Sequence, residues 1–271
     1  MKKLLIVAIM FCFVFENNVF ATLHLYDNFA NPTESETNWT QYEGPGTGHV
    51  AFENGQALLD MSEIGSNWLS QAKMSANNLI PRFNSANEAL RFTWDMQLLD
   101  PLNDTSNDQY NGFFIGTAAR NIIAGQLGDG VSAYGNKRLF FMTGMPSDGV
   151  DRGLNKYHYD LTMQGIGLNA TDPTLVNLTL TFKIYSYNSA YDANPEGYSD
   201  ETPVFSHTRP SALHYNTDLG IKFYKFHPVN STRDSAQCGA MTVDNFYSSI
   251  PEPCTMLFLA IGAAALIKKK G

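Results

Sequence analysis

The feature that most constrains the fold is a two-residue alternation of apolar and polar side chains. Apolar residues alternate with polar ones from Leu90 to Leu98 and again from Leu178 to Ile184. Successive side chains of a β-strand point to opposite faces, so both segments are predicted to be strands with one buried and one wet face. No segment shows the apolar spacing of a long amphipathic helix. The pattern therefore favours an all-β, antiparallel chain.

Further segments with strand-like composition are separated by turn residues. They are His49–Glu53, Gln56–Met61, Trp68–Lys73, Gly112–Ala118, Arg138–Gly144, Lys156–Gln164, Pro203–Thr208, Gly220–His227 and Met241–Ile250. Asn54-Gly55 lies between the first two and predicts a type I′ hairpin, because both residues tolerate positive φ. Residues 22–250 contain neither a linker nor an internal repeat, so they are predicted to form one sandwich or barrel domain.

Residues 1–21 have the order of a secretory signal peptide. Lys2 and Lys3 precede 12 apolar residues, Leu4 to Phe15, and Ala21 stands directly before the predicted cleavage site. A helix of that length rises about 1.5 Å per residue and is too short to cross a hydrocarbon core of about 30 Å. The segment therefore predicts export and cleavage by signal peptidase after Ala21.

Residues 251–271 combine a rigid motif, an apolar segment and a basic end. The motif is Pro251, Glu252 and Pro253, and the basic cluster is Lys268, Lys269 and Lys270. Two prolines this close prevent both helix formation and strand pairing, so the motif is predicted to be extended and accessible. Residues 254–267 carry no charge and are predicted to form a short transmembrane helix, with the lysines on the cytoplasmic side.

In this order the three features resemble the PEP-CTERM sorting signal of Gram-negative bacteria. The resemblance implies that exosortase, a membrane cysteine protease, recognises the tail and releases or transfers the protein after transient insertion in the inner membrane. It also implies a final location in the cell envelope, on the outer surface or in the extracellular matrix. The alternative is a plain C-terminal membrane anchor, for which 14 apolar residues are short.

The charge of the chain argues against a nucleic-acid partner. The whole chain has 18 basic and 26 acidic residues, a net charge of −8. Without the two terminal segments, 13 basic and 24 acidic residues remain, so the body carries about −11. Phosphate backbones require a cationic face, which this composition does not provide. Cys238 is the one cysteine left in the body, and we expect it to be a small buried side chain.

The body resembles the concanavalin A-like jelly rolls of laminin-G and glucanase type. The resemblance rests on an opening segment Leu25–Phe29, a closing segment Val243–Tyr247 that contains Asp-Asn-Phe, Trp39 in a Thr/Gln-rich loop, and the hairpin Val50–Leu59. It implies an antiparallel β-sandwich in which the two terminal strands lie side by side. Because a fold does not determine a function, the site residues need their own argument.

Catalytic motifs are absent from the sequence, so the body is predicted not to be an enzyme. Retaining glycoside hydrolases of this fold carry Glu-x-Asp-x-x-Glu or Glu-x-Asp-x-Glu on one strand, whereas the strand Leu90–Leu98 carries Asp95 alone. The sequence also lacks a nucleophile elbow, a Walker loop and a zinc-protease motif. A secreted glycan-active hydrolase with a carboxylate pair assembled from different strands remains an alternative.

Calcium is the one cofactor that the sequence suggests. No two of the six histidines lie three or four residues apart, which disfavours zinc. Asp27 and Asp244 are expected to approach one another through the paired terminal strands, and Asp104 and Asp108 lie in a second acidic segment. These side chains serve equally well to bond their own backbone in turns. A calcium-dependent adhesion module is therefore a further alternative.

Aromatic residues in turn-rich segments are candidates for stacking on sugars. They are Trp39, Trp68, Tyr187 and Tyr191. Both tryptophans are equally suited to capping the core, and the tyrosines to covering the edge of the sandwich. The sequence thus predicts an exported surface or matrix protein whose body is a non-catalytic carbohydrate-binding or structural module, with polysaccharide as its expected ligand.

Overall fold

The computed structural model describes residues 22–42, 48–60, 70–99, 110–117, 121–127, 139–141, 155–227 and 240–249. The predicted signal peptide (1–21) and sorting signal (251–271) lie outside these residues, as do Trp68, Asp104, Asp108 and Cys238. Among the described residues, no helix has the length and apolar character needed to cross a membrane.

The described chain is almost entirely strand. Its elements are β1 (His24–Asp27), α2 (Pro32–Asn38), β2 (Trp39–Gln41), β3 (His49–Glu53), β4 (Gln56–Asp60), β5 (Ser70–Ala76), β6 (Ala89–Leu99), β7 (Tyr110–Gly116), β8 (Asn121–Leu127), β9 (Leu139–Phe141), β10 (Lys156–Leu168), β11 (Leu175–Ser186), η1 (Ser189–Tyr191), η2 (Pro195–Asp200), β12 (Phe205–His214), β13 (Gly220–His227) and β14 (Ala240–Ser248).

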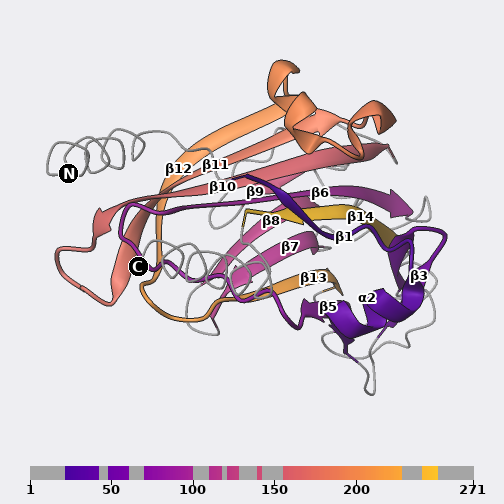
Figure 1. Ribbon diagram of the computed structural model, residues 1–271, viewed down its shortest axis with the longest axis horizontal. Coiled ribbons are helices and arrows are strands. Elements are labelled where there is room, and N and C mark those ends of the chain that lie inside the picture. Colours follow the sequence, from indigo (N-terminus) through magenta and orange to yellow (C-terminus); the bar gives the residue numbers. More distant parts are fainter. Residues whose placement is uncertain are drawn as a thin grey trace, which may run out of the picture.

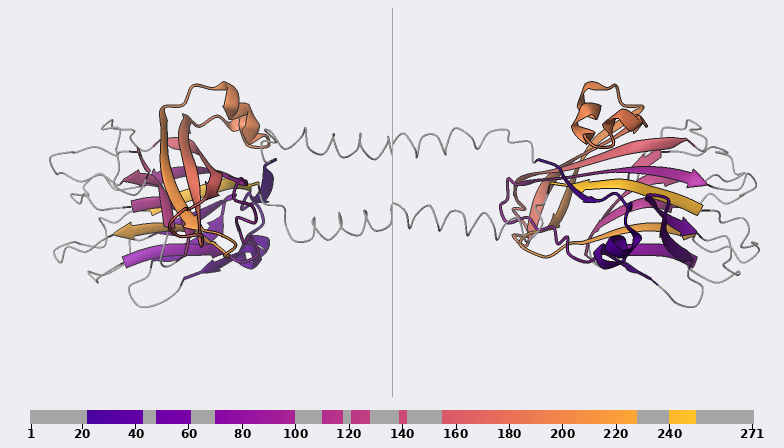
Figure 2. Two further views of the ribbon diagram at one scale, coloured as in Figure 1. Left: turned by 90° about the vertical axis from the view of Figure 1, so that its left-hand side faces the viewer. Right: turned by 45° about the vertical axis from the view of Figure 1, so that its right-hand side comes forward.

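The strands form two antiparallel sheets that stack face to face (Figures 1 and 2). Sheet A has eight strands in the order β12-β11-β10-β6-β14-β4-β3, with β1 also paired to β14. Sheet B has six strands in the order β2-β5-β13-β7-β8-β9. This confirms the predicted antiparallel β-sandwich, and the pairing of β1 with β14 confirms that the terminal strands lie side by side.

The core lies between the sheets and is filled by the apolar halves of the alternating strands. Trp94 of β6 stacks on Phe113 of β7 with ring centroids 4.8 Å apart, and Phe223 of β13 meets Phe246 of β14 at 5.3 Å. All four side chains are fully buried. Burial of one such aromatic side chain stabilises the fold by about 1.5–3 kcal/mol. The aromatic contacts between the sheets therefore fix how the two layers stack.

The structure contains the hairpin predicted from the sequence and two elements, strand β8 and helix α2, that were not predicted. Asn54 and Gly55 have φ values of 52° and 73°, which confirms the type I′ hairpin between β3 and β4. Strand β8 was not predicted, because its sequence NIIAGQL lacks a polar alternation. Helix α2 was not predicted either, because its seven residues, Pro32–Asn38, are too few to show a helical period.

Trp39 belongs to the core and not to a sugar-facing surface. Its side chain is 1% exposed, and its indole Nε1 donates a hydrogen bond of 3.0 Å to Asp27 Oδ2. Asp27 also accepts hydrogen bonds from the backbone N–H of Phe29, the hydroxyl of Ser35 and the amide of Asn38. The carboxylate thus joins β1, α2 and β2, which is the role of a structural hub.

Asp27 and Asp244 do not converge as expected. Asp27 lies opposite Phe246 in the β1–β14 register and bonds toward α2, whereas Asp244 lies on the outer face of sheet A beside Lys156. Among the residues the structure describes, no group of three or more His, Cys, Asp and Glu side chains is arranged to hold a metal ion. Asp27 instead accepts hydrogen bonds within the protein, and Asp244 forms an ion pair with Lys156.

We expect Asp27→Ala to lower the free energy of unfolding by about 2–4 kcal/mol, because several donors to one buried carboxylate lose their acceptor together. Urea unfolding of the full chain followed by tryptophan fluorescence measures the loss. Asp218→Ala is the matched control, because Asp218 pairs with Arg82 on the surface and its loss costs about 1 kcal/mol or less. Equal losses in the two variants would contradict the hub role of Asp27.

Candidate functional site

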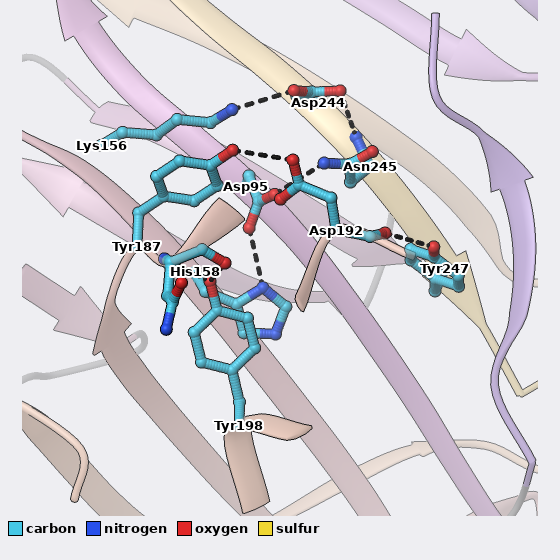
Figure 3. Close-up of polar contacts among 10 residues, drawn as sticks. Asp95, Lys156, His158, Tyr187, Asp192, Tyr198, Asp244, Asn245 and Tyr247 are labelled. Atoms are coloured by element: carbon cyan, nitrogen blue, oxygen red, sulfur yellow. Dashed lines mark hydrogen bonds and ion pairs between the residues drawn. The ribbon is translucent and has the colours of Figure 1, made fainter. Parts of the chain in front are cut away.

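The outer face of sheet A carries a polar side-chain cluster where four strands run side by side. Strand pairing places Asp244 of β14 opposite Asp95 of β6, Asp95 opposite His158 of β10, and His158 opposite Tyr185 of β11. Residues directly opposite one another have Cβ atoms about 4.5–5.5 Å apart. One row across the sheet therefore brings two carboxylates, an imidazole and a phenol together. Figure 3 shows Asp244, Asp95 and His158 of this row.

A β-bulge at Asn245 gives the cluster its shape. Strict alternation would put Asp244 and Phe246 on the same face, but Phe246 is buried in the core while Asp244 and Tyr247 lie on the outer face. Asn245 adopts a φ of 47°, and the register opposite β6 shifts between Asp244 and Tyr247. The extra residue shifts the alternation of β14 by one position, so that Phe246 points into the core and Tyr247 points outward. It also turns the amide of Asn245 toward Asp95.

The centre of the cluster is a buried pair of Asp95 and His158, 1% and 2% exposed. Asp95 Oδ1 lies 2.7 Å from His158 Nδ1, and Asp95 Oδ2 accepts 3.0 Å from the amide of Asn245. A carboxylate only accepts hydrogen bonds, so Nδ1 of His158 carries the proton in this pair. His158 Nε2 is buried and has no hydrogen-bond partner among the described residues. Of the two imidazole nitrogens, Nδ1 is therefore hydrogen-bonded to Asp95, whereas the buried Nε2 has no partner among the described residues.

A connection between β11 and β12, residues 187–204 and here called the insert, folds over this face (Figures 1 and 2). The ring of Tyr198 in η2 stacks on His158 with centroids 3.8 Å apart and planes 5° apart. Tyr247 donates a hydrogen bond of 2.6 Å to the backbone carbonyl of Asp192. The side of β6 that alternation predicted to be wet is therefore buried, because the insert covers it.

An ion-pair network fastens the far end of the insert. Arg91 of β6 donates to Asp160 of β10 at 2.8 Å and to Glu196 of the insert at 2.7 Å. Burial alone would lower the pKa of Arg91, but its hydrogen bonds and attraction to both carboxylates raise it above the ordinary arginine value. Burial and nearby Asp160 also raise the pKa of Tyr185 to about 12, despite the opposing effect of Arg91. Arg91 is therefore always charged, and its position depends on both acids.

At its other end the cluster opens into a half-buried rim, defined as Lys156, Tyr187, Asp192 and Asp244. Tyr187 donates 2.9 Å to Asp192 Oδ2, Lys156 bonds Asp244 at 2.9 Å, and the Lys156 ammonium lies 4.1 Å from the centre of the Tyr187 ring. Burial raises the pKa of Asp244 although Lys156 opposes the shift. Burial and Asp192 likewise raise the pKa of Tyr187. The rim thus presents an aromatic ring among fixed charges of both signs.

Three buried polar atoms of this face retain hydrogen-bonding capacity. They are Thr93 Oγ1, His158 Nε2 and Asp192 Oδ1, none of which has a partner among the described residues. A buried polar group without a partner costs roughly 1–3 kcal/mol. All three atoms are shielded from solvent, so this unmet hydrogen-bonding capacity lies inside the cluster and not on its surface.

The structure brings some predicted site residues together and separates others. Tyr187 and Asp244 share the rim, whereas Tyr191 lies within the insert, edge-on to Tyr198 and bonded to Glu201. Sequence reasoning missed the residues that meet only through strand pairing. These are Arg91, His158, Asp160 and Asn245. Alternation did put Arg91 and Asp95 on one face, but the neighbouring strands were not known.

Comparison with known proteins assigns the chain to no family. No protein-family model matches it, and no curated protein matches it. Solved structures of similar architecture include an endo-1,3-β-glucanase from Streptomyces sioyaensis (10% identity, TM-score 0.48, covering 84% of this chain and 94% of the other). Lectin II from Ulex europaeus (11%, 0.47, 84% and 97%) and an alginate lyase in complex with alginate tetrasaccharide (11%, 0.46, 85% and 93%) are also similar. At TM-scores below 0.5, these similarities transfer no activity or ligand.

We expect Arg91→Met to destabilise the protein by about 3–5 kcal/mol, because it leaves the Asp160 carboxylate buried without its cation. The double variant Arg91→Met with Asp160→Leu should recover most of this loss, since no buried charge is left unpaired and Glu196, the other partner of Arg91, is half exposed. Urea unfolding measures both, and Arg82→Met, which removes an exposed pair with Asp218, is the control. A double variant as unstable as Arg91→Met alone would show that the buried pair is not the cause.

Proposed function

We propose that this chain is an exported, non-catalytic saccharide-binding module and that its ligand lies on the rim of sheet A. The observation that carries the proposal is the rim itself. The half-buried Tyr187 ring stands between the Lys156–Asp244 ion pair and a carboxylate, Asp192, to which its hydroxyl donates a hydrogen bond. Sugars are bound by this combination of an aromatic face and fixed planar polar groups.

The state of the carboxylates supports binding over hydrolysis. Glycoside hydrolysis needs one carboxyl group that gives a proton and a second that is free to attack or to activate water. Asp95 is bonded to His158 and Asn245, and Asp244 is bonded to Lys156. Asp160 and Glu196 share Arg91. Each of these acids therefore already accepts hydrogen bonds from donors within the protein, which suits a fixed recognition surface better than an acid–base pair.

Export and processing form the second half of the proposal and rest on the two ends of the sequence. The apolar run before Ala21 supports secretion, and the Pro-Glu-Pro motif with its apolar segment and terminal lysines supports recognition by exosortase. The mature protein is then placed in the envelope or the extracellular matrix of a Gram-negative bacterium. A location among polysaccharides agrees with a saccharide-binding body.

We expect Tyr187→Ala to weaken binding to the preferred saccharide roughly tenfold, because the stacking face of the rim is lost. A glycan array followed by affinity electrophoresis of the full chain measures this. Tyr187→Phe, which keeps the ring and removes only the bond to Asp192, should retain most of the affinity. Unchanged binding by Tyr187→Ala would move the site elsewhere, and release of reducing sugar that one aspartate substitution abolishes would replace binding by hydrolysis.

We expect replacement of Pro251, Glu252 and Pro253 by alanines to leave the full-length chain in the membrane fraction of a host that encodes exosortase. The physical reason is that the apolar segment 254–267 stays inserted when the motif before it is not cleaved. Fractionation and immunoblotting of cells and medium measure this. A triple-alanine change of Thr33, Glu34 and Glu36 on α2 is the control. Normal release of the motif variant would contradict recognition of this tail.

A further inference from the structure

The outer face of sheet B, on the opposite side of the molecule from the insert, carries lysines among aromatic rings. In one row, Lys73 of β5 lies opposite Tyr224 of β13, and Tyr224 lies opposite Gly112 of β7. In the next row, Lys222 of β13 lies opposite Phe114 of β7. These side chains point away from the core, because the residues between them, such as Met74 and Phe223, are buried in it.

Both ammonium groups rest over aromatic rings. Lys73 Nζ lies 3.9 Å from the ring centre of Tyr42, which is 44% exposed, and Lys222 Nζ lies 5.1 Å from that of Phe114. Such contacts hold a cation in place while leaving it accessible to an anion. The face therefore presents positive charge directly beside surfaces on which a sugar ring can lie.

Neither lysine is neutralised within the part of the chain that the structure describes, where no carboxylate forms an ion pair with Lys73 or Lys222. Burial and the positive charge of Lys222 both lower the pKa of Lys73. The two lysines are diagonal neighbours on adjacent strands, so they repel one another. On a body with a net charge near −11, they form a local region of the opposite sign.

Two glycines follow Lys73 and Tyr224 in the same row of sheet B. Tyr224 lies opposite Gly112 of β7, Gly112 lies opposite Gly125 of β8, and Gly125 lies opposite Phe140 of β9. Neighbouring strands are about 4.8 Å apart, which is comparable to the length of one pyranose unit. An extended sugar chain that runs across the strands can therefore meet a ring, a cation and a short stretch of glycine backbone in succession.

We propose that this face is a second binding site, separate from the rim, and that it takes a polysaccharide bearing carboxylate groups. The carboxylates of uronate units pair with Lys73 and Lys222, and the sugar rings lie on Tyr42 and Phe114. Charge complementarity selects this ligand over a neutral glycan. The salt dependence of the binding follows from the same ammonium–carboxylate pairs.

The test uses the full chain in mild detergent and measures its retardation in gels that contain polygalacturonate or, in parallel, neutral dextran. We expect retardation by polygalacturonate alone, and a loss of most of it when NaCl is raised from about 20 to about 300 mM. Lys73→Gln and Lys222→Gln should each weaken binding roughly fivefold. Lys183→Gln, which removes one lysine from the outer face of sheet A, is the matched control and should bind like the unmodified chain.

Three results would overturn the proposal. They are equal retardation by dextran, unchanged binding of both lysine variants, and an equal loss in Lys183→Gln, which would indicate a response to net charge. Tyr187→Ala separates this site from the rim, because it should leave polygalacturonate binding intact even where it abolishes another ligand. Tyr42→Ala provides a further variant on an exposed side chain, with an expected loss of roughly threefold.

Discussion

The β-bulge at Asn245 is the constraint on which the rest of sheet A depends. Strand β14 pairs with β1, β4 and β6 in the middle of the sheet. The alternation of its side chains between the two faces therefore decides which of them enter the core there. With the extra residue, Phe246 joins the rings between the sheets while Asp244 and Tyr247 stay on the outer face. Without it, either the aromatic core or the polar cluster would lose its central members.

The polar cluster in turn explains why the insert folds where it does. A face with Arg91, Asp95 and His158 cannot be covered by apolar residues without leaving charges unpaired. The insert meets this condition with matched groups: the Tyr198 ring lies on the imidazole, Glu196 bonds the guanidinium, and a backbone carbonyl accepts from Tyr247. Burial of the polar face and order in the insert are therefore two consequences of the same contacts.

The alternation of apolar and polar residues predicted most strands and the inward residues of β6 and β11, because a strand with one buried face has an apolar residue at every second position. It also predicted the Asn54-Gly55 hairpin. The same reasoning described the other face of β6 as wet and could not identify His158, since the meeting of β6, β10 and the insert depends on long-range pairing. Trp39 shows the same limit. Its side chain is of a type that stacks on sugars, but it bonds to Asp27 and packs against the core ring of Phe223.

The two outer faces of the sandwich differ in how their lysines are compensated, and this difference decides what each face can attract. Lys156 is paired with Asp244, and Asp192 adds a second carboxylate, so the rim has no excess positive charge and its selectivity must come from shape and hydrogen bonds. Lys73 and Lys222 lie instead over aromatic rings, whose quadrupoles hold a cation without cancelling its charge. Because the surrounding body is acidic, long-range attraction of an anionic chain is weak until it lies within about 10 Å of these two groups. Selectivity for anions on sheet B therefore comes from short-range contacts with Lys73 and Lys222, whereas the negative net charge of the protein repels anions at longer range.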